Sequence, residues 1–319
     1  MSKTAIVFPG QGSQSIGMLA ELAANFPVFT KTFAEVSDCL RYDVWKLVQE
    51  GPESKLNQTE YTQVAVLTAD VAVFRVLKQE YPLQVSMMAG HSLGEYAALV
   101  CAGAIKLVDA ASLVEKRGQH MQQTVPLGQG AMAAIVGLSD EQVMDVCTRS
   151  SGGGLQVTPA NYNAIGQVVI AGHTAAVEKA LELAEEEGAR MALPIPVSVP
   201  CHCPLLQTAS ARFAENLQQT PIQVPTVSVI SNVDLSIYQS VEQIRSLLAE
   251  QLFKPVRWVE TIQFMKKNNI DNIIECGPGK VLSGLVKRIE KTMNAISVND
   301  KSSLDEAVSS IKEFEGSQS

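Results

Sequence analysis

Apolar residues along the chain form short continuous runs separated by longer segments of helical periodicity. The runs at 4–8, 85–89, 226–231, 272–276 and 295–298 contain few polar positions and do not alternate strictly between polar and apolar. Strands that alternate with helices are typical of a mainly parallel sheet that is covered by helices on both faces. The pattern therefore predicts an α/β fold with a mainly parallel sheet and flanking helices.

The helices expected around this sheet are predicted from the helical spacing of apolar residues and from residues typical of helix ends. Asp109 looks like the N-cap of one of them. The predicted ranges are 16–25, 27–39, 43–50, 59–78, 93–101, 109–123, 204–218, 240–252, 257–268, 280–290 and 302–314.

The order of predicted strands and helices is different between residues 126 and 197. Here the pattern predicts strand, helix, strand, strand, helix and strand, with Ser139 as the N-cap of the first helix. This order is the ferredoxin-like pattern. We therefore expect a large α/β catalytic domain with an α/β-hydrolase-like core, made of residues 1–125 and 198–319, and an inserted ferredoxin-like subdomain at 126–197.

Composition narrows the class of protein. The 319 residues are 46% hydrophobic and 18% charged, which indicates a globular chain of about two domains. A net charge of -8 argues against a nucleic-acid partner. No apolar stretch is long enough for a membrane helix, and the N-terminus has no signal-peptide pattern. The six cysteines are then expected to be thiols in the cytoplasm.

The most informative segment is Gly90-His91-Ser92-Leu93-Gly94, which stands between a predicted strand and a predicted helix. This is the context of a nucleophile elbow, in which a sharp turn exposes the serine. Glycines leave room for the crowded backbone on either side of the turn. Ser92 is therefore the predicted nucleophile, and the amide of Leu93 is a predicted oxyanion donor.

A serine nucleophile needs a base, and His202 is the best candidate among four histidines. Pro200 and Pro204 flank it and fix the backbone, although a purely structural histidine remains an alternative. His120 and His173 are expected on the surface. Cys201 and Cys203 beside His202 could suggest a metal, but a structural zinc site would need a second ligand cluster that the sequence lacks.

Arg117 is out of place on its predicted helix. At 3.6 residues per turn it falls between Leu113 and Val114, in the apolar stripe rather than on the charged face. A buried guanidinium needs an anion or several acceptors. Two interpretations stay open: an internal salt bridge, or a substrate carboxylate bound by both ends of the guanidinium.

The Gly10-Gln11-Gly12 segment after the first strand fits neither phosphate-binding fingerprint. It lacks the Gly-Lys-Ser/Thr of a P-loop, and Ser15 stands where a dinucleotide fingerprint has its third glycine. The backbone N–H of Gln11 remains as a second oxyanion donor, and a tight turn without a functional role is the alternative.

Four segments together resemble one family, the malonyl-CoA:acyl carrier protein transacylases of bacterial fatty-acid synthesis. The resemblance covers essentially the whole chain, including the inserted subdomain. The segments are residues 8–14 (Phe-Pro-Gly-Gln-Gly-Ser-Gln), 90–95 (Gly-His-Ser-Leu-Gly-Glu), 199–202 (Val-Pro-Cys-His) and 275–282 (Glu-Cys-Gly-Pro-Gly-Lys-Val-Leu).

The resemblance implies an [acyl-carrier-protein] S-malonyltransferase, of the type EC 2.3.1.39, that works through a malonyl-serine intermediate. It implies no metal and no redox cofactor. The site residues that it implies are the nucleophile Ser92, the base His202, the backbone carbonyl of Gln251 that orients this base, the malonyl-binding Arg117 with Gln63 near it, and the oxyanion amides of Gln11 and Leu93.

Acyl carrier protein is acidic, so an acidic enzyme needs a local basic patch to bind it. Four cations lie on and just after the predicted helix 280–290, and ordinary solvated charges are the alternative explanation. They are Lys280, Lys287, Arg288 and Lys291.

Two other functions compete with the transferase. A serine esterase, thioesterase or patatin-like hydrolase would use the same elbow, but the 117 residues after His202 are unusual for an α/β-hydrolase, whose histidine lies near the C-terminus. A non-enzymatic carrier-protein docking module would have no use for Ser92, His202 and Arg117 together.

Overall fold

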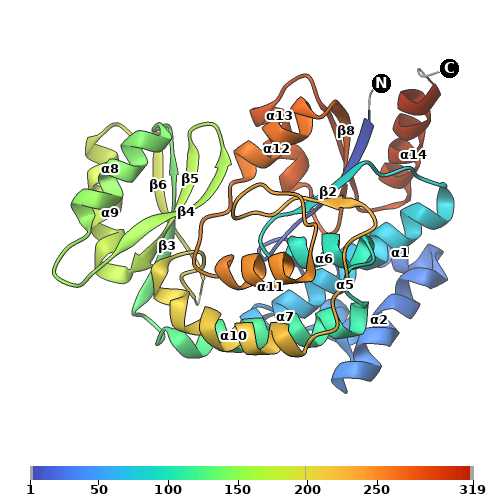
Figure 1. The fold of residues 1–319 in the computed structure, drawn as a ribbon, viewed down its shortest axis with the longest axis horizontal. Coiled ribbons are helices and arrows are strands. Elements are labelled where there is room, and N and C mark those ends of the chain that lie inside the picture. The colour runs from blue at the N-terminus through green and yellow to red at the C-terminus, as the bar shows by residue number, and fades with distance from the viewer. Residues whose placement is uncertain (1–2, 198, 317–319) are drawn as a thin grey trace.

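Two sheets of different kinds organise the chain in the computed structural model, which describes residues 3–197 and 199–316 (Figure 1). The larger sheet is parallel and has the strand order β7-β2-β1-β8-β9. Its strands are β1 (Lys3–Phe8), β2 (Met87–Gly90), β7 (Ser228–Val229), β8 (Ile270–Cys276) and β9 (Asn294–Val298).

Helices cover both faces of the larger sheet, and none of those in the described ranges is long and apolar enough to cross a bilayer. Those before the second sheet are α1 (Ala20–Asn25), α2 (Pro27–Leu40), α3 (Val44–Glu50), α4 (Glu53–Leu56), α5 (Thr59–Glu80), α6 (Gly94–Cys101) and α7 (Leu107–Thr124). Those after it are the 3-10 helix η1 (Pro204–Leu206), α10 (Gln207–Gln219), α11 (Val241–Glu250), α12 (Trp258–Lys267), α13 (Val281–Ile289) and α14 (Lys301–Gly316).

Strand β1 shows why the apolar runs are continuous. Ala5 and Val7 belong to the cluster that packs on α12 and α13, whereas Ile6 and Phe8 belong to the cluster on α5, α6 and α14. Successive side chains of a strand point to opposite faces, so a strand buried on both faces needs apolar residues at every position. The predicted fold class is confirmed.

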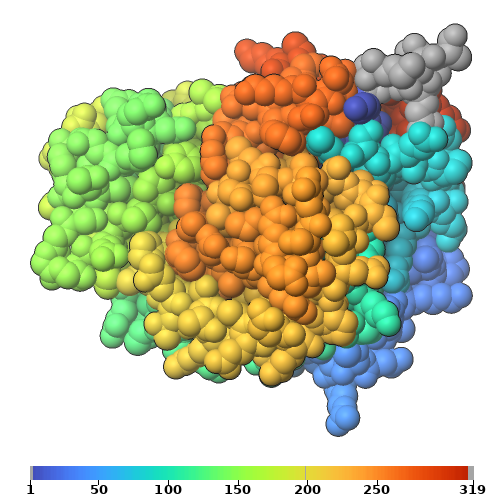
Figure 2. Space-filling model, in the orientation of Figure 1, coloured from blue at the N-terminus to red at the C-terminus, as the bar shows by residue number. Residues whose placement is uncertain are grey.

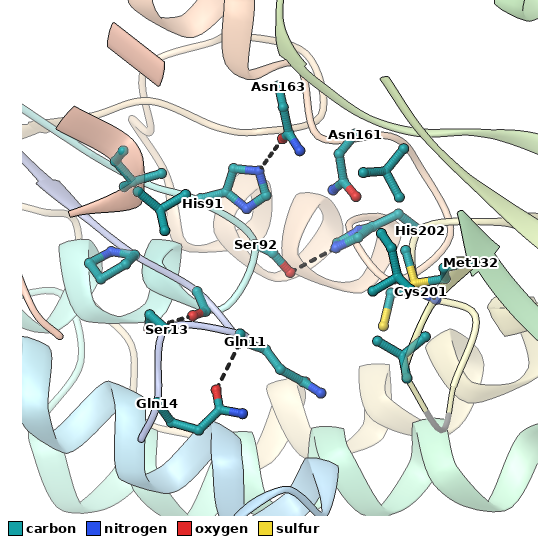
Figure 3. Close-up of a pocket in the computed structure, with 18 of the residues that line it drawn as sticks. Gln11, Ser13, Gln14, His91, Ser92, Met132, Asn161, Asn163, Cys201 and His202 are labelled. Atoms are coloured by element: carbon teal, nitrogen blue, oxygen red, sulfur yellow. Dashed lines mark hydrogen bonds between the residues drawn. The ribbon is translucent and has the colours of Figure 1, made fainter. Parts of the chain in front are cut away.

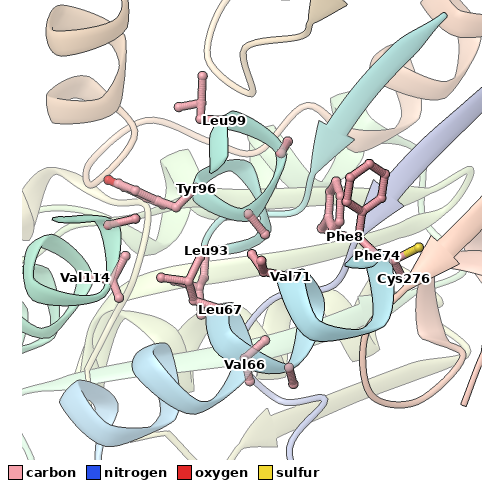
Figure 4. Close-up of a cluster of buried hydrophobic side chains, with 14 of the residues drawn as sticks. Phe8, Val66, Leu67, Val71, Phe74, Leu93, Tyr96, Leu99, Val114 and Cys276 are labelled. Carbon is pink, nitrogen blue, oxygen red and sulfur yellow. The ribbon is translucent and has the colours of Figure 1, made fainter. Parts of the chain in front are cut away.

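Helix α5 lies in the centre of the larger core. Its buried side chains face β1 as well as α6 and α7, so it is apolar almost all round (Figure 4). The edge-to-face pair of Phe74 with Phe8 joins this helix to the strand that ends at the site. Packing of this kind holds the strand end and the elbow helix on a rigid base.

The second sheet is antiparallel with the order β4-β5-β3-β6, which is the ferredoxin-like arrangement (Figure 1). In the space-filling view this part of the chain, in green and yellow-green, forms a lobe at one end of the molecule (Figure 2). Its strands are β3 (Gly130–Val136), β4 (Val157–Ala164), β5 (Gln167–His173) and β6 (Met191–Ile195). Helices α8 (Asp140–Ser150) and α9 (Thr174–Glu186) cover one face. Ser139 caps α8 in a capping box with Gln142, as its position predicts.

Three local predictions are wrong. The helix predicted at 16–25 starts only at Ala20, because Gly17 and Leu19 have left-handed backbones, with φ of 79° and 59°. The strand predicted at 226–231 shortens to β7, because the chain leaves the sheet edge there. Asp109 is not an N-cap: α7 begins at Leu107, and Asp109 lies in its first turn, where its charge suits the helix dipole.

Gly90 and Gly94 allow the elbow to pass close to its neighbours. A Cβ atom on Gly90 would lie 1.8 Å from the carbonyl carbon of Gly94, and one on Gly94 would lie 2.1 Å from the carbonyl oxygen of Phe8. Both clashes are with backbone, which cannot rotate away as a flexible side chain can.

We predict that Gly94→Ala lowers the free energy of unfolding by about 3 kcal/mol, because β1 and the elbow would have to separate. Gly284→Ala is the matched control, since a Cβ on this helical glycine of α13 meets nothing within 4 Å. The control should be neutral or more stable by up to about 1 kcal/mol. Urea denaturation measures both, and equal stability of the two variants would contradict the crowding argument.

Candidate active site

Ser92 lies at the apex of the turn between β2 and α6 with φ of 53°, a left-handed backbone that non-glycine residues rarely adopt. Asn232 braces this conformation from the end of β7. Its Oδ1 accepts a hydrogen bond from the Ser92 N–H at 2.8 Å, and its Nδ2 donates to the carbonyl of Gly90 at 2.8 Å. The strained apex is thus fixed on both sides by one amide side chain.

His202 is placed to take the serine proton. Its Nε2 lies 2.7 Å from Ser92 Oγ, and its Nδ1 lies 2.7 Å from the backbone carbonyl oxygen of Gln251 (Figure 3). A carbonyl can only accept, so Nδ1 carries the proton and Nε2 is left as the acceptor for the serine hydroxyl. The backbone N–H of His202 also donates to the carbonyl of Leu252 at 3.0 Å, which ties the imidazole to the same loop.

The surroundings of His202 favour its neutral form. Its side chain is buried, and desolvation together with the nearby charge of Arg117 lowers its pKa to about 3. The imidazole is therefore unprotonated at neutral pH and can act as a general base.

Arg117 is buried, only 2% exposed, with its guanidinium directed at the nucleophile. Its Nη1 donates to Gln63 Oε1 at 2.9 Å, and its Nη2 donates to Gln251 Oε1 at 2.9 Å and to Ser92 Oγ at 3.3 Å. Within the described residues no carboxylate forms an ion pair with it. Of the two interpretations of this arginine, the internal salt bridge is therefore not what the structure contains.

The two amides expected to bind an oxyanion flank the serine. Leu93 follows it directly as the N-cap of α6, and Gln11 lies in the loop after β1 that lines the same cavity. Leu93 N is 3.7 Å from the position of a Cβ on Gly10, so the two loops are in contact. No acceptor in the described part of the chain receives a hydrogen bond from either amide, which leaves both N–H groups available to a ligand.

A cavity of about 750 Å³ opens above these groups, between the two sheets (Figure 3). The large domain contributes the Gln11 loop, the elbow and the first turns of α13. The small sheet contributes the face opposite α8 and α9, through Met132, Asn161, Val169 and Ile195. The volume is that of a small-molecule site with an apolar wall and a polar floor.

Four polar residues of the site were not predicted from the sequence. Asn161 and Asn163 are two residues apart on β4, and both line the cavity. Asn163 Oδ1 also lies 2.8 Å from His91 Nε2. The spacing of the two asparagines was the only available signal. Glu95 stands in the 90–95 segment, but nothing in the sequence indicates its contacts, and Asn232 has no signal at all, because the partners of both residues are distant in sequence.

The cysteines beside the base serve neither as a nucleophile nor as part of a metal cluster in the described structure. Burial raises the pKa of Cys201 to about 11, so its thiol stays neutral in the cavity wall. No group of three His, Cys, Asp or Glu side chains suited to a metal occurs among the residues described.

Comparisons with known proteins show what the chain as a whole is similar to. The family described as "Acyl transferase domain" matches residues 5–307. The malonyl CoA-acyl carrier protein transacylase of Haemophilus influenzae is 51% identical over 306 residues, 96% of this chain and 98% of the relative. The solved transacylase of Coxiella burnetii is 48% identical with a TM-score of 0.95 and covers 98% of each chain. A malonyl-transacylase solved in complex with a holo type II PKS acyl-carrier protein is 50% identical with a TM-score of 0.95, over 97% of this chain and 100% of that one.

The lowered pKa of His202 gives a direct prediction. Its ring proton signals in NMR, identified by their loss in His202→Gln, should not move between pH 8 and about pH 5, whereas a free histidine in the same sample titrates near its usual value of about 6.5. The unfolded chain takes up this proton near pH 6.5 and the folded chain does not, so the contribution of His202 to stability is present above that pH and decreases below it. A midpoint near 6.5 in the folded protein would mean that the imidazole is solvated.

Proposed function

The chain belongs to the acyl transferase family, and we propose that it transfers a malonyl group from malonyl-CoA to the phosphopantetheine thiol of acyl carrier protein. One observation carries this proposal: a buried guanidinium, with no carboxylate partner among the described residues, lies 3.3 Å from Ser92 Oγ. A malonyl group on Ser92 ends in a carboxylate two carbon atoms beyond its ester carbonyl, within reach of Arg117.

The first half-reaction acylates the enzyme. Ser92 Oγ attacks the thioester carbonyl while its proton passes to His202 Nε2, and the negative oxygen that forms is bound by the amides of Leu93 and Gln11. One such donor contributes about 2.7–4 kcal/mol to the transition state. The carbon–sulfur bond then breaks, and CoA leaves with the proton held by His202.

The second half-reaction runs the same steps backwards with a different thiol. The carrier-protein thiol gives its proton to His202 and attacks the malonyl-serine ester, and Ser92 recovers its proton as it leaves. No step calls for a metal or a redox cofactor. The absence of both stays a prediction, as do the individual roles of the site residues, Gln63 among them.

The hydrolase alternative is not favoured, because the similar curated proteins and solved structures bear the names of transacylases. The non-enzymatic docking module fits poorly with a nucleophile and base joined at 2.7 Å. We also propose that the protein works in the cytoplasm, since all six cysteines are free thiols.

The basic patch is a proposed docking surface for acyl carrier protein. Its four residues, Lys280, Lys287, Arg288 and Lys291, are exposed on and beside α13. Val281, Leu282 and Leu285 of the same helix line the cavity, so a carrier protein bound there would have its thiol arm near the entrance.

Intact-mass spectrometry after brief exposure to malonyl-CoA tests the function. We expect a malonyl adduct that is absent in Ser92→Ala and that disappears when holo acyl carrier protein is added, together with weaker labelling by acetyl-CoA, which has no carboxylate for Arg117. Rapid loss of the adduct to water without carrier protein would indicate a hydrolase instead.

Reversing the charge at Lys287 and Arg288 should raise the KM for acyl carrier protein about tenfold at low salt, and the effect should shrink as salt screens the charges. A double reversal at Lys31 and Lys46, exposed on α2 and α3, is the matched control and should leave this KM unchanged. The same KM in both variants would place the docking surface elsewhere.

A further inference from the structure

Glu95 is a buried carboxylate near Ser92 that takes no part in the proposed proton transfers. It lies in the first turn of α6, three residues after Ser92, and has no exposed surface. Its oxygens accept hydrogen bonds from the hydroxyl of Tyr238 at 2.5 Å, from Gln251 Nε2 at 2.6 Å and from the backbone N–H of Asn232 at 3.4 Å. None of these three donors is charged.

Gln251 connects this carboxylate to the arginine, and its amide has only one satisfactory orientation. Its Nε2 donates both to Glu95 Oε2 and to the carbonyl oxygen of Ser92 at 2.9 Å, and neither of these atoms can donate in return. Its Oε1 therefore faces the other way, where it accepts from Arg117 Nη2. A flipped amide would set its NH₂ against the guanidinium and its oxygen against two acceptors.

The result is a pair of buried opposite charges separated by one neutral side chain. Neither Arg117 nor Glu95 forms an ion pair within the described residues. Burial raises the pKa of Glu95 to about 7, and the three donors together with the charge of Arg117 oppose that rise. A direct pair would occupy the guanidinium, whereas a separated pair balances its charge and leaves donors for a substrate.

We propose that Glu95 is a positioning residue that acts as the counter-ion of Arg117, held one side chain away by Gln251, and that it limits how tightly the site binds the malonyl carboxylate. This inference rests on the proposed function, in which Arg117 binds that carboxylate. Binding the malonyl carboxylate equally tightly in the ground state and in the transition state does not raise the rate of transfer. The negative charge of Glu95 weakens the attraction while the buried arginine stays balanced.

The test compares acylation of Ser92 by malonyl-CoA and by acetyl-CoA in single turnovers at about pH 8, where Glu95 is mostly ionised. In Glu95→Gln the amide oxygen can still accept from Gln251, so the principal change is the lost charge. We expect the half-saturating concentration of malonyl-CoA to fall about tenfold, that of acetyl-CoA to stay unchanged, and the Tm to drop. Free malonate should then raise the Tm of the variant more than that of the wild type.

Three controls complete the design. Glu115→Gln removes the same charge from the helix that carries Arg117, but from its partly exposed side, and should change nothing. Arg117→Ala should lose the preference for malonyl-CoA over acetyl-CoA. Tyr238→Phe removes one donor from Glu95 without changing the net charge. It should shift malonyl binding in the same direction as Glu95→Gln, but by a smaller factor. This variant provides a second test if Glu95→Gln does not fold.

An unchanged malonyl-CoA dependence in Glu95→Gln or in Tyr238→Phe would overturn the proposal. So would an equal loss with both acyl donors, which marks a purely structural residue, and so would a selective weakening of malonyl binding. A wild-type enzyme that malonyl-CoA does not acylate would instead contradict the proposed function itself.

Discussion

The burial of the Arg117 guanidinium is the constraint around which the site is arranged. A buried cation normally takes a carboxylate partner, because its desolvation is costly. Here neutral amide oxygens from Gln63 and Gln251 satisfy it, and the opposite charge lies one side chain further away at Glu95. The two terminal nitrogens of the arginine thus have acceptors, its buried Nε has no partner among the described residues, and its charge remains open to the cavity. This explains why so many amide side chains surround a single nucleophile.

The larger sheet brings the parts of the site to one edge. The Gln11 loop follows β1, the elbow follows β2, Asn232 lies just after β7, and the Gly277-Pro278-Gly279 turn before α13 follows β8. Since all these strands are parallel, their carboxyl ends meet at the same edge, where α/β proteins commonly bind ligands. The inserted sheet then closes the opposite wall. Ser92 and its surroundings are therefore positioned by packed strands and short turns.

How much of this could be predicted depended on how local each signal was. The elbow and the N-cap at Ser139 are encoded in a few consecutive residues, and the fold class and the βαββαβ order followed from the succession of strand and helix patterns along the chain. The inward position of Arg117 followed from helical spacing alone. In contrast, the brace from Asn232 to Ser92 joins residues 140 positions apart, and the bond from Gln251 to Glu95 spans 156. No periodicity encodes such contacts, because they depend on how the strands are ordered in the sheet.

The orientation of His202 by a backbone carbonyl follows from the same electrostatic constraint. Serine enzymes of the triad type place a carboxylate behind the histidine, which stabilises the imidazolium that forms during the reaction. A carboxylate in place of the Gln251 carbonyl would add a negative charge behind an imidazole that already lies within the electrostatic influence of Arg117, and it would weaken the attraction of this arginine for a substrate carboxylate. The carbonyl fixes the tautomer without adding a charge. Because no negative charge lies behind the ring, the imidazolium is poorly stabilised, as the low pKa of His202 indicates. If Arg117 binds the substrate carboxylate as proposed, orienting His202 with a dipole rather than a charge keeps that cation available.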